Sequence, residues 1–166
     1  MRDAELRMLL KSIRRIARAV DIQSRRIDRE VGLTLPQLVV LTSVRDLGEV
    51  TSRTISKEAD LSPATVVGIL DKLESKNLIE RYRSTLDRRI VHTRLTPRGA
   101  AALNRAPAPL GDAFEHAFLE LDARLRTQTL EGLRRVADLV TMETTPPAVD
   151  PGPPPGKDVT SSGVVL

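Results

Sequence analysis

The chain has 166 residues, of which 29% are charged and 40% are apolar, and its formal net charge is +4. This composition is typical of one globular domain, or of one domain with an appendage. The absence of cysteine excludes disulfides, zinc–thiolate sites and thiol-based redox sensing. Aromatic residues make up only 2%, which disfavours proteins that stack single-stranded nucleic acid on aromatic rings. No apolar run approaches the roughly 18 residues of a membrane span and no signal-peptide pattern is present, so we expect a cytoplasmic protein without membrane contacts.

The first part of the chain predicts helices separated by short turns. Over residues 4–31, apolar side chains recur every three or four residues, the spacing of one face of a long helix. Pro36 favours a second helix that ends near Leu47. Thr51 is a suitable N-cap for a short third helix that ends near Ala59.

A tight turn ending in Ser62 and Pro63 predicts a fourth helix, with the serine as N-cap and the proline at the first helical position. The side chains expected in its buried stripe are Val66, Ile69, Leu70 and Leu73. Residues 79–83 and 90–95 then alternate like two strands, joined by a loop over 84–89. A helix-turn-helix followed by such a hairpin, or wing, predicts a winged helix.

The remainder of the chain is expected to be helical as far as residue 143. Helical sequence resumes at Thr96, and the helices that follow are broken around 105–111 and near 122–128. Residues 144–166 hold six of the eleven prolines, so we expect a disordered tail there. The sequence thus predicts a mainly α-helical fold with a small β-hairpin. Its expected divisions are a winged helix-turn-helix lobe over 32–98 and a helical dimerisation region over 1–31 and 99–143.

The fourth helix is the expected reading helix, because the second helix of a helix-turn-helix enters the major groove with its N-terminal residues at base edges. Thr65 offers a hydroxyl to a base and a methyl group to thymine, and Val67 offers an apolar contact. The predicted major-groove residues are Ser62, Pro63, Ala64, Thr65, Val67, Gly68 and Lys72. Taken alone, Ser62 and Pro63 are equally well explained as an efficient helix start.

The hairpin concentrates positive charge, with six arginines against one acid, Asp87, over residues 81–98. A narrow minor groove attracts an inserted arginine, a role that suits Arg88 or Arg89 at the loop tip. Asp87 is interpreted as a brace that holds Arg89 and stiffens the loop. The flanking residues expected to reach phosphates are Arg81, Arg83 and Arg94. Each arginine alone is more simply a solvated surface charge, but that explanation is weaker for the whole group.

Three motifs carry a resemblance to a known family: LESKNLI over 73–79, DRR over 87–89 and LTPRG over 95–99. In this order the chain resembles the bacterial MarR family of transcriptional regulators, over roughly residues 4–143. Asn77 stands where that family usually has glycine, and asparagine tolerates the same left-handed backbone geometry.

The resemblance implies that residues 62–68 read the major groove and that Arg89, positioned by Asp87, enters the minor groove. It also implies a homodimer on a double-stranded, pseudo-palindromic operator, with repression as the expected outcome and no cofactor. The apolar content of the first and last helices independently favours a dimer, because it exceeds what a small winged helix can cover. A small-molecule effector is implied in a cleft between the dimer helices and the lobe. Candidate lining regions are the first helix, with Arg15, Arg18 and Asp21, the start of the second helix, and the region of the fifth helix.

A weaker resemblance, over 12–27, 84–96 and 105–118, is to the branch that represses synthesis genes for ectoine and other compatible solutes. It implies an osmotic or ionic signal. An enzyme is not expected, since His92 and His116 are far apart in sequence and no catalytic or metal-binding motif appears. The remaining alternative is a winged helix used only for protein contacts, which would favour an apolar or acidic wing.

Overall fold

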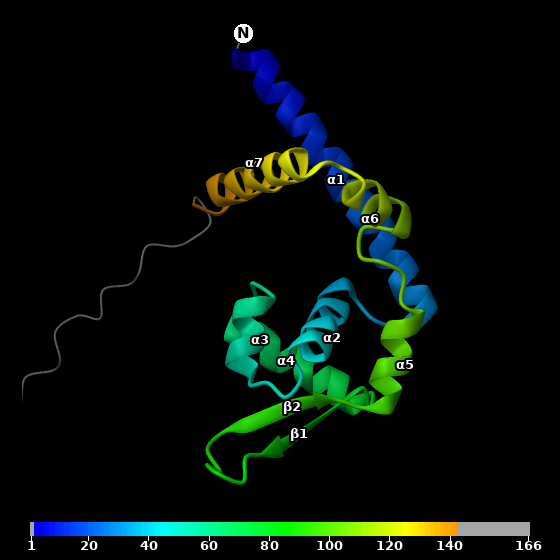
Figure 1. The fold of residues 1–166 in the computed structure, drawn as a ribbon, viewed down its shortest axis with the longest axis vertical. Helices are drawn as coiled ribbons and strands as arrows, with labels where there is room; N and C mark the ends of the chain where they lie inside the picture. The colour runs from blue at the N-terminus through cyan, green and yellow to red at the C-terminus, as the bar shows by residue number, and fades with distance from the viewer. Residues whose placement is uncertain (1, 143–166) are drawn as a thin grey trace, which may run out of the picture. The chain divides into compact units, whose positions relative to one another are not determined.

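The computed structural model describes residues 2–142, so the predicted tail over 144–166 lies outside the described residues. Figure 1 shows a mainly helical chain with one antiparallel hairpin, which confirms the predicted fold class. In order, the elements are α1 (Arg2–Val31), α2 (Leu35–Leu47), α3 (Ser52–Glu58), α4 (Pro63–Ser75), β1 (Ile79–Arg83), β2 (Val91–Leu95), α5 (Pro97–Arg105), α6 (Asp112–Leu119) and α7 (Ala123–Met142). Internal packing divides the described residues into two units, one that ends at Glu120 and one that begins at Leu121. Within residues 2–142, no helix has an apolar stretch that could cross a lipid bilayer.

The helices of the lobe begin where the sequence predicts, because hydroxyl side chains cap their first turns. Thr34 caps α2 in a reciprocal capping box with Gln37. Thr51 caps α3, Ser62 caps α4 and Thr96 caps α5, each by accepting a hydrogen bond from the backbone N–H three residues later. Such caps typically contribute about 1 kcal/mol each to helix stability. The starts of α2 to α5 are therefore determined locally.

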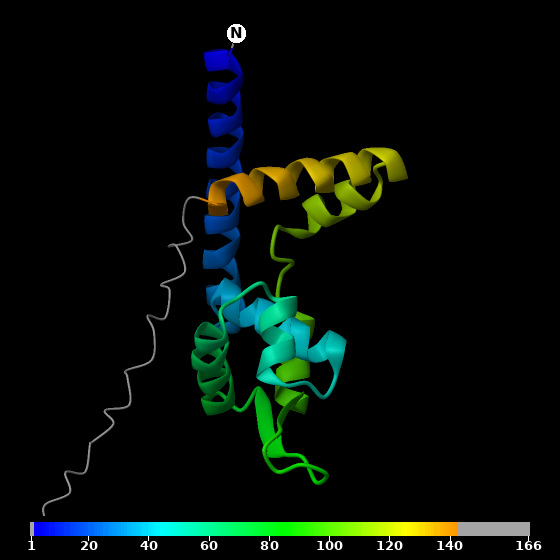
Figure 2. The ribbon, with the colours of Figure 1, turned by 90° about the vertical axis from the view of Figure 1, so that its left-hand side faces the viewer.

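The core is aliphatic and gathers side chains from every element of the lobe. Its most deeply buried large side chains include Ile27, Leu33, Leu41, Ile55, Leu70, Leu73 and Ile79. Ile27 comes from the C-terminal part of α1, and the buried pair Ala102 and Leu103 comes from α5. The end of α1 and all of α5 are thus anchored to the lobe. The first part of α1 extends away from α2–α5 (Figure 1 and Figure 2).

The hairpin pairs Ile79 with Leu95 at its base and Arg83 with Val91 near its loop. A third segment joins it, because Val50 and Thr93 exchange backbone hydrogen bonds of 3.1 and 2.7 Å. The sequence predicted a helix start at the neighbouring Thr51 but did not reveal this bridge. It fastens the middle of β2 to the turn between α2 and α3. In both views the loop joining β1 and β2 projects beyond the rest of the lobe (Figure 1 and Figure 2).

Two details of the connections follow from backbone geometry. Asp60 and Asn77 adopt positive φ angles of 50° and 56°, a geometry that aspartate and asparagine tolerate, and Asn77 does so where the family usually has glycine. The break predicted near 122–128 is wrong in position. It lies at 120–122, and α7 begins at Ala123 because Asp122 Oδ1 accepts a hydrogen bond of 2.9 Å from the backbone N–H of Leu125.

Candidate nucleic-acid interface

The exposed side of α4 carries every residue predicted for the major groove. The exposed residues of the helix and its preceding turn include Ser62, Pro63, Ala64, Thr65, Val67, Gly68 and Lys72. The opposite stripe, as predicted, is buried in the core. Whether these seven residues contact DNA stays a prediction, but all seven are accessible to a ligand.

The first two turns of this surface are small and mostly apolar. Val67 is 45% exposed, a large value for a valine in a folded lobe. Ser62 Oγ lies 2.7 Å from Thr65 Oγ1 and also accepts a hydrogen bond of 3.1 Å from the backbone N–H of Thr65. The two hydroxyl groups therefore satisfy each other at the helix start. The surface presents methyl groups rather than charge.

Arg88 and Arg89 are exposed in the loop of the wing. Within residues 2–142, neither guanidinium has an ion-pair partner, and Arg88 contributes only its backbone carbonyl, which accepts a hydrogen bond of 2.9 Å from Arg83 Nη1. Both side chains are thus available to an anionic ligand. A projecting loop with two free guanidinium groups has the form needed to enter a narrow groove lined by phosphates.

Asp87 braces this loop through the backbone. Its Oδ1 accepts a hydrogen bond of 2.9 Å from the backbone N–H of Arg89, and its carbonyl oxygen accepts one of 2.9 Å from Ile90. Ser84 Oγ closes the other side by accepting hydrogen bonds from the amides of Leu86 and Asp87, at 3.2 and 3.4 Å. The carboxylate therefore orders the turn and leaves the guanidinium of Arg89 outside the brace.

Arg81 has internal partners that the sequence reasoning did not anticipate. Its guanidinium lies 2.7 Å from the carboxylate of Asp71, and its Nε donates a hydrogen bond of 2.9 Å to Glu74 Oε2. Its side chain is only 28% exposed. Hydrogen bonds from Arg81 lower the pKa of Glu74 below its ordinary value. This arginine connects β1 to α4, so its expected phosphate contact competes with two carboxylates.

Arg94 is also engaged within the wing. It forms an ion pair with Glu80, lies 4.0 Å from Glu49 Oε1 and stacks over the ring of Tyr82, with 5.1 Å between the guanidinium carbon and the ring centroid. With Arg83 bonded to the loop carbonyl, the flanking arginines stiffen the wing. The uncommitted positive charge of the hairpin is concentrated at Arg88 and Arg89.

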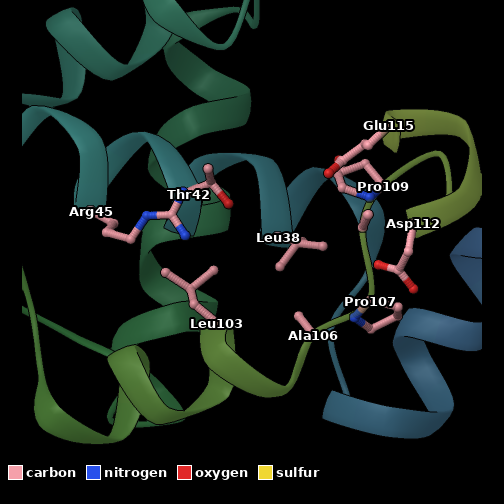
Figure 3. Close-up of a pocket in the computed structure, with 10 residues that line it drawn as sticks. Leu38, Thr42, Arg45, Leu103, Ala106, Pro107, Pro109, Asp112 and Glu115 are labelled. Carbon is pink, nitrogen blue, oxygen red and sulfur yellow. The ribbon is translucent and has the colours of Figure 1, made fainter. Parts of the chain in front are cut away.

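A cleft of about 380 Å³ lies elsewhere in the unit formed by residues 1–120. Figure 3 shows Arg45 at one end and Asp112 with Glu115 at the other. The remaining lining residues are Leu38, Thr42, Leu103, Ala106, Pro107, Ala108 and Pro109. The lining thus comes from α2, α5, α6 and the loop between the last two.

The lining of this cleft does not include the predicted effector residues of α1, which are Arg15, Arg18 and Asp21. These three side chains are exposed, and Asp21 forms an ion pair with Arg25. Within residues 2–142, no three histidine or acidic side chains gather as the ligands of a metal ion would.

Comparisons with known proteins agree with this geometry. The model of the MarR family matches residues 33–91. The chain is 31% identical over 106 residues to the transcriptional repressor NicR of Pseudomonas putida, which covers 64% of this chain and 67% of NicR. It is 33% identical over 89 residues to the regulator YsmB of Bacillus subtilis, covering 54% of this chain and 61% of YsmB. With the repressor MdtR of the same organism it shares 38% identity over 68 residues, or 44% of MdtR.

Solved structures show the same fold. BpsR of Bordetella bronchiseptica, a protein whose DNA binding is regulated by 6-hydroxynicotinic acid, is 28% identical, with a TM-score of 0.60 over 78% of this chain and 98% of BpsR. The regulator BldR of Sulfolobus solfataricus is 20% identical, with a TM-score of 0.62 over 82% of this chain and 96% of BldR.

Proposed function

Because the chain belongs to the MarR family of winged-helix transcriptional regulators, we propose that it is a sequence-specific repressor that binds duplex DNA as a homodimer. The observation that carries this proposal is an exposed face of small residues on α4 together with a wing loop that exposes Arg88 and Arg89, neither of which has an ion-pair partner within residues 2–142. Small side chains let α4 sit deep in the major groove, while arginines at a wing tip suit the adjacent minor groove.

The exposed apolar surface outside the lobe supports a homodimer. The exposed large apolar side chains of α1, α6 and α7 include Leu6, Leu9, Leu10, Ile16, Phe114, Leu125, Leu130 and Leu133. Leu6 and Leu130 are 55% and 56% exposed. Contact of several such leucines with water along one helix face is unfavourable and is typical of a surface that binds a partner. A second copy of the chain would cover these faces and supply a second reading helix. Two half-sites about one helical turn apart would then be bound together.

Repression is the proposed outcome because a dimer that occupies a promoter blocks polymerase without further contacts. NicR and MdtR are both named as repressors. The test is a gel shift on the DNA upstream of the chain's own gene, paired with a reporter driven by that DNA. We expect retarded duplex and lowered reporter output with the wild-type chain. Arg89→Ala should weaken both effects. Binding to no duplex at low ionic strength would contradict the proposal and favour a winged helix used only for protein contacts.

We further propose that an effector binds in the cleft of Figure 3. Arg45 Nε donates a hydrogen bond of 2.8 Å to Asp46, and the other N–H groups of its guanidinium would supply the contact to an anionic group. Leu38 with Leu103 offers an apolar wall. A ligand there would release DNA only if it prefers a lobe arrangement that does not fit the operator. The test adds aromatic carboxylates to the operator complex at constant ionic strength. Arg45→Gln should lose the response while keeping its affinity for the operator, and an equal response of the variant would contradict this cleft.

Ionic strength is a second proposed input. Each phosphate neutralised by the protein lowers log affinity by about 0.9 per log unit of salt. A complex that rests on arginine contacts would therefore dissociate as cytoplasmic salt rises, which fits an osmotic signal. The reporter should be derepressed by raised osmolarity in cells. Unchanged reporter output under osmotic stress would remove this input without affecting the DNA-binding proposal.

A further inference from the structure

Gly68 occupies an unfavourable place for a glycine, the interior of α4. Glycine is the poorest helix former after proline, so its presence inside a helix indicates a packing or binding requirement for the missing side chain. No contact within residues 2–142 explains it, because a Cβ added to Gly68 would meet no atom of that part of the chain within 4 Å. The residue is also exposed. The space beside Gly68 is therefore open on the side that an external ligand would approach.

The side chains around Gly68 offer methyl groups. Ala64 and Val67 are exposed one turn before it and directly beside it. Thr65 is exposed and has its hydroxyl 2.7 Å from Ser62 Oγ, so the hydroxyl is already engaged and the methyl group remains for an apolar contact. The nearest exposed acid, Asp71, is paired with Arg81. The first two turns of α4 thus form an apolar surface with a bare backbone at its centre.

This surface lacks the side chains that identify guanine or adenine directly. Arginine or lysine pairs with two acceptors of guanine, and asparagine or glutamine pairs with the edge of adenine. None of these four residue types occurs over residues 62–71, and Lys72 follows only in the third turn. The one apolar feature that a base shows in the major groove is the 5-methyl group of thymine.

We propose that α4 reads its half-site through thymine 5-methyl groups, with Ala64, Thr65 and Val67 as the contacting side chains and Gly68 left bare so that a base edge can approach the helix. The inference rests on the proposed DNA binding and adds the chemical class of sequence recognised. The wing agrees with it, because narrow minor grooves that attract arginine occur in A·T tracts. Both parts of the surface therefore favour the same base pair.

The test begins with selection of bound duplexes from a random library by the full-length chain. Thymines of the selected half-site are then replaced one at a time by deoxyuridine, which removes the 5-methyl group and keeps the base pair. We expect affinity to fall about fourfold for each thymine that faces α4, because the free energy gained by burying one methyl group in the complex is lost. Val67→Ala should bind more weakly and lose most of this sensitivity at one position in each half-site.

Gly68→Ala provides a second readout, which a purely structural role would not give. The variant should unfold at a higher temperature than the wild-type chain and yet bind the selected duplex at least tenfold more weakly. Ser75→Ala, in the last turn of the same helix, is the matched control and should keep both properties near wild type. Recovery of no duplex would overturn the proposed function and this inference together. Recovery of a duplex whose affinity is unchanged by every deoxyuridine would overturn this inference alone.

Discussion

Glu74 of α4 and Arg81 of β1 form a two-point contact between the reading helix and the wing. Arg81 Nε donates to Glu74 Oε2 at 2.9 Å, and the backbone N–H of Arg81 donates to Glu74 Oε1 at 3.3 Å. The side chain and the strand backbone are thus bound to the same carboxylate. The proposed complex needs α4 and the wing to contact one duplex at the same time. This contact fixes the position of α4 relative to the wing, and DNA binding depends on that position.

The stability of this contact should depend on pH in one direction. Hydrogen bonds from Arg81 lower the pKa of Glu74, whose unfolded-state pKa is about 4.3. The contact therefore contributes stability that is fully present above about pH 4.3 and is lost as pH falls through the lowered pKa. Urea unfolding between about pH 3 and pH 7 should show a smaller acid-induced loss of unfolding free energy in Glu74→Gln than in the wild-type chain. Identical pH profiles would contradict a folded-state interaction at this carboxylate.

Arg81 and Arg89 should differ in the salt dependence of DNA binding. Arg81 is committed to Asp71 and Glu74, whereas the guanidinium of Arg89 has no ion-pair partner within residues 2–142. Arg89→Ala should reduce the slope of log affinity against log salt concentration by about 1. Arg81→Gln should lower the melting temperature and leave that slope unchanged. The slopes are measured by fluorescence anisotropy. A reduced slope in Arg81→Gln and an unchanged slope in Arg89→Ala would show that Arg81, and not Arg89, contacts a phosphate.

Asp87 provides a test of the brace in the wing. Asp87→Ala removes the acceptor for the backbone N–H of Arg89, so the loop should loosen and affinity for the operator should fall about tenfold, close to the lower end of the contribution of one hydrogen bond to a charged group. Asp87→Asn keeps a side-chain oxygen at that position and should retain most of the affinity. Neither change should alter the melting temperature much, because the loop is exposed. Equal losses in both variants would show that charge, rather than loop order, is the contribution of Asp87.

The sequence was sufficient for features determined by a few neighbouring residues. The caps at Thr34, Thr51, Ser62 and Thr96 act within one turn, so their patterns can be read directly. The bridge between Val50 and Thr93 joins distant segments and leaves no local pattern. Arg81 was misleading for the same reason: its charge is visible in the sequence, but its carboxylate partners depend on how β1 packs beside α4. Its expected phosphate contact therefore stays a prediction that the salt measurement will decide.

Asn77 lies at the turn between α4 and β1 with a φ angle of 56°. Asn77→Gly should leave stability unchanged or raise it slightly, because glycine adopts this geometry without strain. Asn77→Val should lower the free energy of unfolding by about 1–2 kcal/mol, since a β-branched residue is strained at positive φ. Thermal unfolding of the two variants checks the pair. Equal stability of both would contradict the left-handed geometry of this turn.

Gly99 in α5 is required by a close approach. A Cβ at this position would lie 2.0 Å from the carbonyl oxygen of Leu78, a backbone atom that cannot move aside freely. Gly99→Ala should therefore destabilise the chain by about 1–3 kcal/mol or more. Gly132→Ala in α7 is the matched control, because no atom lies within 4 Å of the added Cβ, and it should stabilise the chain by about 0.5–1 kcal/mol. A stable Gly99→Ala variant would contradict the packing of α5 against the start of the wing.

The measurement that tests the central claim most directly is hydroxyl-radical footprinting of the full-length chain on its selected duplex. Two segments of protected deoxyribose are expected on the backbone beside the major grooves that hold α4, with centres about 10 base pairs apart and related by two-fold symmetry. Each should be flanked by a protected minor-groove segment that disappears in the double variant Arg88→Ala, Arg89→Ala. A single protected segment, or minor-groove protection that survives in the double variant, would contradict an account in which paired copies place α4 and the wing on one duplex.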